Sequence, residues 1–572
     1  MSLLRRWLPP WITQYPRGHL RDDVMAGLIV TMLVVPQSLA YALLAGLPPQ
    51  AGLYVSIFPV IAYALLGSSM TQAVGPVAIT AIMTFSLLSP LAAAGSAHYI
   101  ALAATLSLLS GVLILLSGAF RLGYLSQLLS RPVVSGFISG SAILIVISQL
   151  KFLLGVSNTG SSTWQTVRTL YEHAALANPT TLTIGLSALV SLYAARIWLA
   201  RALTRVGMSL RSAEFTVRVV PLLLVVLATL AVMTFNLDAE RQVAVVGPVR
   251  QGLAGFSFFV PDLDSFKLLA LPALILAFIG MVQNITMAQA LAIKRREKIS
   301  ANRELAGLGA ANVVAAFYGG MPVGGGLSRS AVNVAAGAIT PLASIISALA
   351  MLGVVAMGTH WFARLPLAVL AASIVVAAIS MIDVRALKQA WSYDRADALA
   401  LLGTALGVLV LGLEQGIALG IGLSLATLLL RASTPHIAVI GRIAGTEHFR
   451  NVQRHGVETI PGVLFLRIDE SLFFGNLGAF EARLAAELEQ APATHDVVLI
   501  MSAVNRVDTT AMEVLTDINS ELAQRHIRLH LAEVKGPVQD RLERTLLWKS
   551  LSGSVHLSVN TAFESFAAAL HK

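Results

Sequence analysis

Twelve long apolar runs constrain the fold of this chain more than any other feature of its sequence. Crossing the hydrocarbon core of a bilayer, about 30 Å thick, takes about 20 apolar helical residues. Hydrophobic residues make up 56% of the chain and charged residues 12%, whereas soluble domains carry about a quarter charged residues. The sequence therefore predicts a polytopic α-helical membrane protein. The runs occupy residues 24–44, 50–67, 99–118, 132–153, 179–200, 215–235, 268–293, 302–319, 339–358, 364–382, 396–413 and 415–431.

Two glycine-containing breaks interrupt the apolar segments, one in each half of the chain. The first covers residues 71–76 and the second residues 319–330. The apolar stretches after them, about 76–89 and 328–338, are too short to span a membrane alone, which favours half-helices and raises the segment count to fourteen. Interrupted segments in corresponding positions of two halves indicate a transporter's binding site, because each break leaves a helix N-terminus at mid-bilayer depth.

The placement of basic residues predicts the orientation in the membrane. Lys and Arg gather in the loops after even-numbered segments, so these loops and both termini are expected in the cytoplasm, with the protein in the (inner) plasma membrane. Seven segments lie before residue 240 and seven after residue 265. Because seven is odd, the repeats at about 24–235 and 268–432 run in opposite directions, as a 7+7 inverted repeat within a transport domain at 24–432.

The N-terminal residues 1–23 differ from the membrane segments. Four arginines alternate here with Trp7 and Trp11, and no compact apolar core with a cleavage site follows. This pattern predicts an interfacial segment on the cytoplasmic side rather than a signal peptide.

The last 138 residues have the composition of a soluble domain. They hold 13 Lys and Arg against 16 Asp and Glu, so the positive excess of the chain lies in its first 434 residues. Strand and helix alternate here, which predicts a small cytoplasmic α/β domain at 436–572 with a mixed or parallel sheet. Strands are predicted at 462–468, 496–501 and 527–534, and helices at 480–490, 509–525, 537–547 and 561–570.

Composition also argues against several functions. The positive excess lies on the membrane part, where it is typical of lipid anchoring, so nucleic acid is not an expected partner. The chain has no cysteine, which excludes disulfides, thiolate metal sites and thiol nucleophiles. The twelve histidines do not cluster, and no Gly-x-Ser-x-Gly hydrolase signature occurs. We expect neither an enzyme nor a bound metal or cofactor.

The second break has the chemistry of an anion site. A helix that begins near Ser328 offers unpaired backbone N–H groups and roughly half a positive charge, and a half-helix that begins near Val77 would face it if the repeats cross at the midplane. Arg329 adds a full charge at a depth where an isolated charge is costly. The glycines at 324–326 let the backbone approach a ligand closely. The alternative interpretation is a plain loop, with Arg329 snorkelling to an interface.

Several stretches carry a family resemblance in their order along the chain. They are residues 35–54, 75–78, 287–292, 302–305, 317–322 and 328–333. These stretches resemble the SulP anion transporters, the family that includes prestin, and the resemblance runs from about residue 15 to the end. The tail resembles a STAS domain, the sulfate-transporter and anti-sigma-factor-antagonist module.

This resemblance implies a mechanism and a site. It implies a moving core of segments 1–4 and 8–11 against a gate, an elevator-like motion, and a homodimer. The anion would lie between the starts of segments 3 and 10, with Arg329 beside it. The implied substrate-binding residues are Gln37, Tyr41, Val77, Ala78, Gly326, Leu327, Ser328 and Arg329.

One position departs from the family pattern. Proton-coupled members and sodium-coupled bicarbonate carriers tend to have a carboxylate on segment 8 where this chain has Gln283, and the sodium-type members have a hydroxyl where it has Met287. A glutamine does not titrate, and a thioether is a poor ligand for a hard ion. We therefore count Gln283 among the site residues and expect exchange or uncoupled transport rather than cation symport. The alternative is coupling through another carboxylate, such as Glu304.

The function predicted from the sequence is secondary active transport of a small anion. The alternative is a channel-like or voltage-responsive membrane protein on the same scaffold. Backbone amides recognise charge and size more than chemical identity, so sulfate, bicarbonate, chloride, nitrate and small dicarboxylates all stay open. The family resemblance favours sulfate or bicarbonate.

A short motif in the tail suggests regulation. Residues 508–511, Asp-Thr-Thr-Ala, occupy the position of the Asp-Ser-Ser-Gly phosphoacceptor signature of soluble relatives, which implies a regulatory role for Thr509 and Thr510. The alternative is a plain helix N-cap, where Asp and Thr are favoured without any kinase.

Overall fold

The structure, a computed structural model, forms two compact units, Met1–Ser424 and Leu425–Lys572. The residues that it describes are 9–13, 15–124, 130–156, 163–247, 252, 256–357 and 362–570. The division between the units falls inside helix α21, Leu413–Ser433. Part of the predicted N-terminal segment lies outside the described residues.

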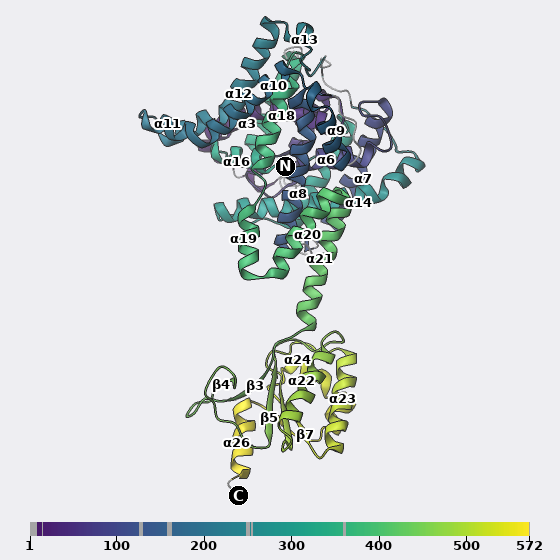
Figure 1. The fold of residues 1–572 in the computed structure, drawn as a ribbon, viewed down its shortest axis with the longest axis vertical. Helices are drawn as coiled ribbons and strands as arrows, with labels where there is room; N and C mark the ends of the chain where they lie inside the picture. Colours follow the sequence, from purple (N-terminus) through teal and green to yellow (C-terminus); the bar gives the residue numbers. More distant parts are fainter. Residues whose placement is uncertain are drawn as a thin grey trace. The chain divides into compact units, whose positions relative to one another are not determined.

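The first unit is built from helices, and each apolar run predicted from the sequence coincides with one or more of them (Figure 1). The described residues contain seven helical stretches long and apolar enough to cross a membrane, or eight if the bent helix α3 is one span, and some of these stretches combine two of the helices given below. The fourteen crossings therefore stay a prediction. The helices are α2 (Pro10–Thr13), α3 (Leu20–Leu44), α4 (Pro49–Tyr54), α5 (Phe58–Leu66), α6 (Ala78–Leu88), α7 (Ala97–Ala119), α8 (Arg131–Leu154), α9 (Thr163–Glu172), α10 (Pro179–Ala194), α11 (Ala200–Arg205), α12 (Leu210–Thr234), α13 (Leu237–Glu240), α14 (Leu263–Arg295), α15 (Ala301–Phe317), α16 (Leu327–Ala335), α17 (Leu342–Met357), α18 (Leu367–Ile379), α19 (Val384–Tyr393), α20 (Arg395–Leu411) and α21 (Leu413–Ser433).

Several boundaries differ from the prediction. The run at 50–67 is two helices, α4 and α5, joined by a turn at residues 55–57. Residues 20–23, which the prediction gave to the N-terminal segment, are the first turn of α3, and the Asp23 carboxylate holds this turn in place. It is fully buried and accepts hydrogen bonds from the backbone N–H groups of Ile339 and Thr340, at 2.8 and 3.0 Å, which ties the start of α3 to the loop before α17.

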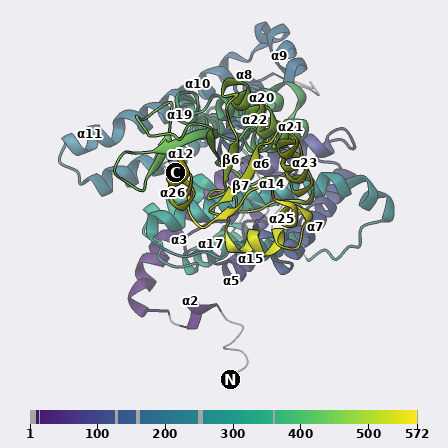
Figure 2. The same cartoon turned by 90° about the horizontal axis from the view of Figure 1, so that it is seen from below.

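The helices of the first unit pack in two groups. In one group α3, α5, α7, α14, α15 and α17 lie side by side, and α3, α17, α5 and α15 can be followed in Figure 2. In the other group α8 packs against α10, α18 and α20. The short helices α6 and α16 belong to the first group, where both contact α3. This arrangement brings the two breaks, distant in sequence, to the same region.

The second unit is an α/β domain with a mixed six-stranded sheet, in the order β4-β3-β5-β6-β7-β8. β3 is antiparallel to β4 and to β5, and β5 to β8 are mutually parallel. The prediction found β5, β6 and β7 but missed the other three, and its helix at 537–547 is two helices. The elements are β3 (Ile437–Arg442), β4 (Phe449–Asn451), β5 (Val463–Ile468), α22 (Leu477–Gln490), β6 (Asp496–Ile500), α23 (Thr509–Gln524), β7 (Arg528–Ala532), α24 (Gly536–Leu542), α25 (Leu546–Ser550), β8 (Val555–His556) and α26 (Val559–Leu570).

The sheet of the second unit is covered on both faces. α22 to α25 pack on one face, and α26 packs on the other through Phe563 (Figure 1). A buried carboxylate, Asp496, stands at the first position of β6 and accepts hydrogen bonds from Arg528, His530 and His495. Burial alone would raise the pKa of Asp496, but these hydrogen bonds outweigh it, and the pKa lies below its ordinary value.

Candidate functional site

Each break contains a short extended segment, and these two segments pair with each other. β1 (Val74–Gly75) runs antiparallel to β2 (Gly324–Gly325), with Val74 opposite Gly325 and Gly75 opposite Gly324. The Gly326 N–H extends the pairing by donating to the Ala73 carbonyl at 3.1 Å. The two break segments, about 250 residues apart in the sequence, thus form a single crossing point.

A helix begins directly after each of the paired segments. α6 starts at Ala78 behind the extended residue Val77, and α16 starts at Leu327 behind the extended residue Gly326. Neither N-terminus has a side-chain cap. The first-turn N–H groups of an uncapped helix have no hydrogen-bond acceptor within the helix, and together they carry about half a positive charge. Two such ends at one crossing point favour an anion between them.

Arg329 joins the two breaks. Its side chain comes from α16 and is buried, and it donates to the carbonyl oxygens of Val74 and Pro76 at 3.1 and 3.2 Å. A Cβ atom at Gly75 would lie 1.7 Å from Arg329 Nη1, so the guanidinium needs a glycine beneath it. Both acceptors are neutral carbonyls, so these two bonds leave the positive charge of the guanidinium unneutralised.

A buried polar network supports the other side of the crossing. Glu304 is fully buried, and Asn284 links it to Gln72, whose amide nitrogen lies 2.6 Å from the Asn284 oxygen. A Cβ atom at Gly325 would lie 2.4 Å from this Gln72 nitrogen, so the network packs directly against β2. The Glu304 carboxylate accepts hydrogen bonds from Tyr63, Ser68, Ser69 and Asn284.

Gln283 lies next to this network and contacts the crossing from α14. Its amide nitrogen donates to the Gly325 carbonyl oxygen at 3.3 Å, which ties α14 to β2. The side chain is only partly buried, unlike that of the neighbouring Asn284. The sequence singled out Gln283, and the structure puts it at the edge of the paired breaks.

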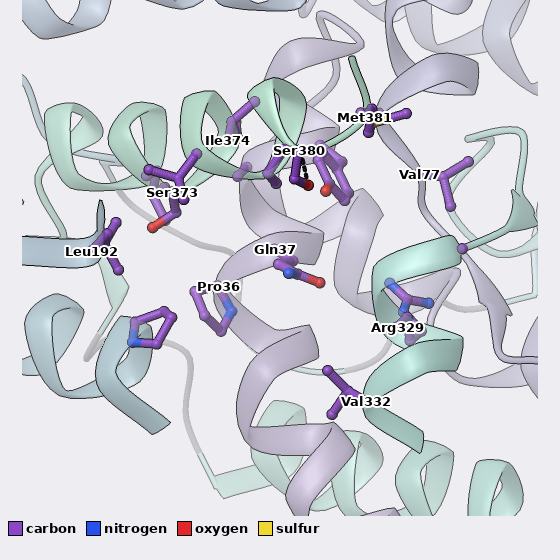
Figure 3. Close-up of a pocket in the computed structure, with 18 of the residues that line it drawn as sticks. Pro36, Gln37, Val77, Leu192, Arg329, Val332, Ser373, Ile374, Ser380 and Met381 are labelled. Atoms are coloured by element: carbon purple, nitrogen blue, oxygen red, sulfur yellow. Dashed lines mark hydrogen bonds between the residues drawn. The ribbon is translucent and has the colours of Figure 1, made fainter. Parts of the chain in front are cut away.

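The crossing point opens on a cavity of about 570 Å³. Figure 3 shows Val77 and Arg329 on one side of Gln37, and Leu192, Ser373 and Ile374 on the other. The residues predicted from the sequence that line this cavity are Gln37, Tyr41, Val77, Ala78, Gln283, Gly326 and Arg329. For Leu327 and Ser328 the structure describes the backbone, in the first turn of α16, and their side chains lie outside what it describes.

A bend in α3 accounts for the position of Gln37 and Tyr41. The helix turns by 43° between Leu20–Met32 and Val34–Leu44. Pro36 lies inside it, and a proline ring clashes with the carbonyl four residues earlier, here that of Met32. Pro36, Gln37 and Tyr41 then all line the cavity.

The opposite wall of the cavity was missed from the sequence. It comes from α10, α12 and α18 and from the π-helical turn Ala195–Leu199 after α10, and it is mostly apolar. Apolar residues in a membrane segment look alike whether they face lipid or a cavity, so periodicity could not separate them. The available signal was the polar residues Arg196, Ser373 and Ser380, which stand in otherwise apolar segments. The lining residues of this wall are Leu192, Arg196, Val217, Val220, Pro221, Val225, Leu370, Ser373, Ile374, Val376, Ala377, Ser380 and Met381.

The charge of the cavity has one sign. The described residues that line it include two guanidinium groups, Arg196 and Arg329, and no carboxylate. Glu304, the alternative coupling residue, is not among them, and its carboxylate is turned toward Tyr63 and the loop at residues 68–69. The site is therefore suited to an anion.

Comparison with known families decides what this chain belongs to. The profile of the sulfate permease family matches residues 20–404, and the STAS domain profile matches residues 456–562. This chain belongs to the sulfate permease family. The family is one of membrane transporters of small anions, and the fold and the STAS domain expected from the sequence are confirmed.

Relatives in this family match nearly all of the chain. A probable sulfate transporter of Mycobacterium tuberculosis is 33% identical over 565 residues, which are 98% of this chain and 98% of that one. The chloroplastic sulfate transporter 4.1 of Arabidopsis thaliana is 33% identical over 549 residues, 94% of this chain and 78% of that one.

Solved structures share the fold of this chain. The murine Slc26a9 anion transporter in its inward-facing state matches with a TM-score of 0.88 at 22% identity, over 99% of this chain and 95% of that one. The transmembrane domain of the cyanobacterial bicarbonate transporter BicA matches with a TM-score of 0.59 at 22% identity, over 72% of this chain and 98% of that one. At this identity the likeness concerns the fold alone.

The Asp-Thr-Thr-Ala motif at residues 508–511 of the STAS domain lies at the start of α23. The Asp508 carboxylate accepts from the Ala511 N–H at 2.8 Å and from the Phe474 N–H at 3.0 Å, so it acts as the N-cap of α23. Thr509 and Thr510 are exposed in the first turn. The cap is thus observed, while a regulatory role for the two threonines stays a prediction.

Proposed function

We propose that this protein is a secondary active transporter of small anions, with sulfate as its first candidate substrate. The observation that carries the proposal is the pair of uncapped helix N-termini, α6 and α16, beside Arg329 at one cavity. Fixed dipoles and a buried cation stabilise a small anion without enclosing it, which suits a site that must also release its ligand.

The relatives' names support sulfate as the first candidate. The relatives that cover almost all of this chain are called sulfate transporters. Bicarbonate is the second candidate, followed by other small anions and dicarboxylates. The proposed binding residues are those of the crossing and the cavity: Gln37, Tyr41, Val77, Ala78, Gln283, Gly326, Leu327, Ser328 and Arg329.

We propose that transport is exchange or uncoupled rather than cation symport. The Gln283 amide donates a hydrogen bond where a carboxylate could hold a proton or a cation, and the described lining of the cavity has no carboxylate. Alternation would be elevator-like, with the group containing α3, α6, α14 and α16 moving against the group containing α8, α10 and α18. The arrangement in the (inner) plasma membrane with both termini in the cytoplasm, and a homodimer, belong to the same proposal.

The decisive experiment is a counterflow panel in proteoliposomes. Purified protein is reconstituted with unlabelled anion inside, and entry of labelled sulfate, bicarbonate and chloride is measured. We expect saturable uptake of sulfate, with strong loss in Arg329→Ala. Absence of uptake of every anion by the wild type would contradict transport.

Two further measurements on the same vesicles test the mechanism. An imposed proton or sodium gradient should not drive net sulfate uptake, and uptake driven by either gradient would contradict the uncoupled mechanism. Planar bilayer recordings separate a carrier from a channel, because ohmic single-channel currents would favour the channel-like alternative.

A further inference from the structure

The open side of the cavity can be located from the exposure of its lining. Most lining residues are buried or half-buried, including Tyr41, Val77 and Arg329 around the paired breaks. Three of them, Arg196, Ala331 and Ser380, are exposed. These three residues come from different segments, and we call the exposed part of the lining, which they make up, the mouth of the cavity.

Arg196 is the only cation among the described lining residues at this mouth. It stands in the π-helical turn Ala195–Leu199, between α10 and α11. A π turn has one residue more than an α turn and often marks a functional site in a helix. Here the turn lets the side chain of Arg196 border the cavity together with Leu192, which precedes the turn and is labelled in Figure 3.

Arg196 differs from Arg329 in how firmly it is held. Arg329 is buried and donates two hydrogen bonds to backbone carbonyls of the first break. Arg196 is exposed, and its guanidinium donates one long hydrogen bond, of 3.4 Å, to the carbonyl of Val376 on α18. A weakly held guanidinium at a cavity mouth can turn toward a passing anion and release it again, whereas Arg329 is fixed in place.

We propose that Arg196 is the cation that attracts anions to the mouth and passes them inward to Arg329 and the helix N-termini. The proposal rests on the proposed transport function and adds a role that the binding site itself does not need. Apolar walls on α10, α12 and α18 keep the local dielectric low, so the field of a mouth cation is focused along the cavity. The attraction is twice as large for a doubly charged anion such as sulfate as for chloride.

The expected signature is a change in apparent affinity that depends on salt. Removing a single charge several ångströms from the path of a divalent anion should raise the KM about threefold to tenfold at low ionic strength. The maximal rate should stay near that of the wild type, because the helix ends and Arg329 are untouched. Salt of about 0.5 M should reduce the difference to less than about twofold, since exposed charges are then screened.

The absence of cysteine from the chain gives a direct test. Arg196→Cys is the single thiol of the variant, and it can be modified in detergent before reconstitution. A methanethiosulfonate reagent with a quaternary ammonium group restores a positive charge, and one with a sulfonate group adds a negative charge. The readout is uptake of labelled sulfate into proteoliposomes loaded with unlabelled sulfate.

The expected order of KM values is ammonium-modified below unmodified below sulfonate-modified, with the ammonium-modified protein within about twofold of the wild type. Arg201→Cys, an exposed arginine in α11 that does not line the cavity, is the matched control and should respond little to either reagent. Rescue by the cationic reagent on the same preparation also shows that Arg196→Cys is folded.

Three results would overturn the proposal in different ways. Equal KM values for the two modified forms of Arg196→Cys, with normal wild-type uptake, would remove the role of Arg196 and leave the proposed function intact. No sulfate uptake by the wild type would overturn sulfate transport and this inference with it. A fall in the maximal rate that neither reagent reverses would show that Arg196 is needed for structure instead.

Discussion

Arg329 on α16 donates a hydrogen bond of 3.1 Å to the carbonyl oxygen of Val74, which belongs to the other break of the membrane unit. A second bond reaches Pro76, just before the start of α6. The guanidinium therefore does more than supply charge, because it sets the position of one helix N-terminus relative to the other.

Arg329→Ala should lose both the charge and this link. Each hydrogen bond from a charged donor is worth about 1.5 to 3 kcal/mol, so we expect sulfate transport to fall by about tenfold or more and the melting temperature to drop. Arg329→Lys keeps the charge but has a single donor group in place of the planar fork. It should recover part of the transport and little of the stability. Wild-type uptake by Arg329→Ala would remove this residue from the site.

Gly75→Ala should reproduce much of the loss seen in Arg329→Ala. A Cβ atom at position 75 would lie 1.7 Å from Arg329 Nη1, so the guanidinium would have to leave its two carbonyl acceptors. Because both changes break the same contact, the double variant should be no worse than Arg329→Ala alone. Sulfate uptake by the three variants measures this.

The matched control is Gly353→Ala on α17, where an added Cβ atom has no neighbour within 4 Å. This variant should transport sulfate like the wild type. Its folded state should be slightly more stable, because alanine favours a helix more than glycine does. Independent, additive losses in the Gly75→Ala and Arg329→Ala double variant would contradict the shared contact.

Gln283→Glu should make transport depend on pH. The wild-type amide donates to the Gly325 carbonyl, so an ionised glutamate would place two acceptors against each other and add a negative charge to the anion cavity. Protonation restores the donor and removes the charge. Sulfate uptake by the variant should therefore rise as pH falls from 8 to 5.5, while uptake by the wild type stays nearly flat. Equal pH profiles for the two proteins would show that a carboxylate at residue 283 does not make transport depend on pH.

The positions of the breaks could be predicted from the sequence because they depend on local rules. Residues 71–76 and 319–330 contain glycine and proline in apolar surroundings, and the structure has β1 and β2 there, each followed by a short helix. Arg329 was singled out because a cation in a membrane segment is costly without a role. Its two carbonyl partners were not foreseeable, since they are long-range contacts.

The second wall of the cavity and part of the sheet illustrate what local rules miss. Leu192 and Ile374 line the cavity, but nothing in an apolar helix distinguishes a residue that faces a cavity from one that faces lipid. β4 and β8 have only three and two residues, too few for an alternation pattern. Both features follow from tertiary packing, which brings distant segments together.

Thr510 phosphorylation is a prediction with a clear structural consequence. Thr509 and Thr510 are exposed in the first turn of α23, where a phosphate would be stabilised by the helix N-terminus. Intact-mass and peptide mass spectrometry of protein isolated from its native membrane should show the modification at Thr510 if the motif is regulatory. Its absence under all growth conditions would leave Asp508 as a plain N-cap.

The stability of the second unit should rise with pH between about 5 and 7. Burial lowers the pKa of His530 below its ordinary value, and the Asp496 hydrogen bond offsets this only in part. Its Nε2 donates to Asp496 and its Nδ1 accepts from the Ser554 N–H at 3.0 Å, so the folded domain requires the neutral ring. Below about pH 6.5 the unfolded chain binds a proton at this histidine that the folded domain excludes, so the stability is present above that pH and is lost as pH falls.

Asp496 contributes at lower pH with the same sign. Its pKa lies below the ordinary carboxyl value, so its share of the stability is present above about pH 4 and is lost as pH falls through its folded pKa.

Hydrogen exchange of peptides from β6 and β7 in the full-length protein, followed from pH 5 to 7.5, measures the pH dependence expected from His530. His530→Gln should flatten this profile, and His448→Gln, an exposed histidine outside the cluster, should leave it unchanged. A profile that stays steep in His530→Gln would assign the pH dependence to other groups.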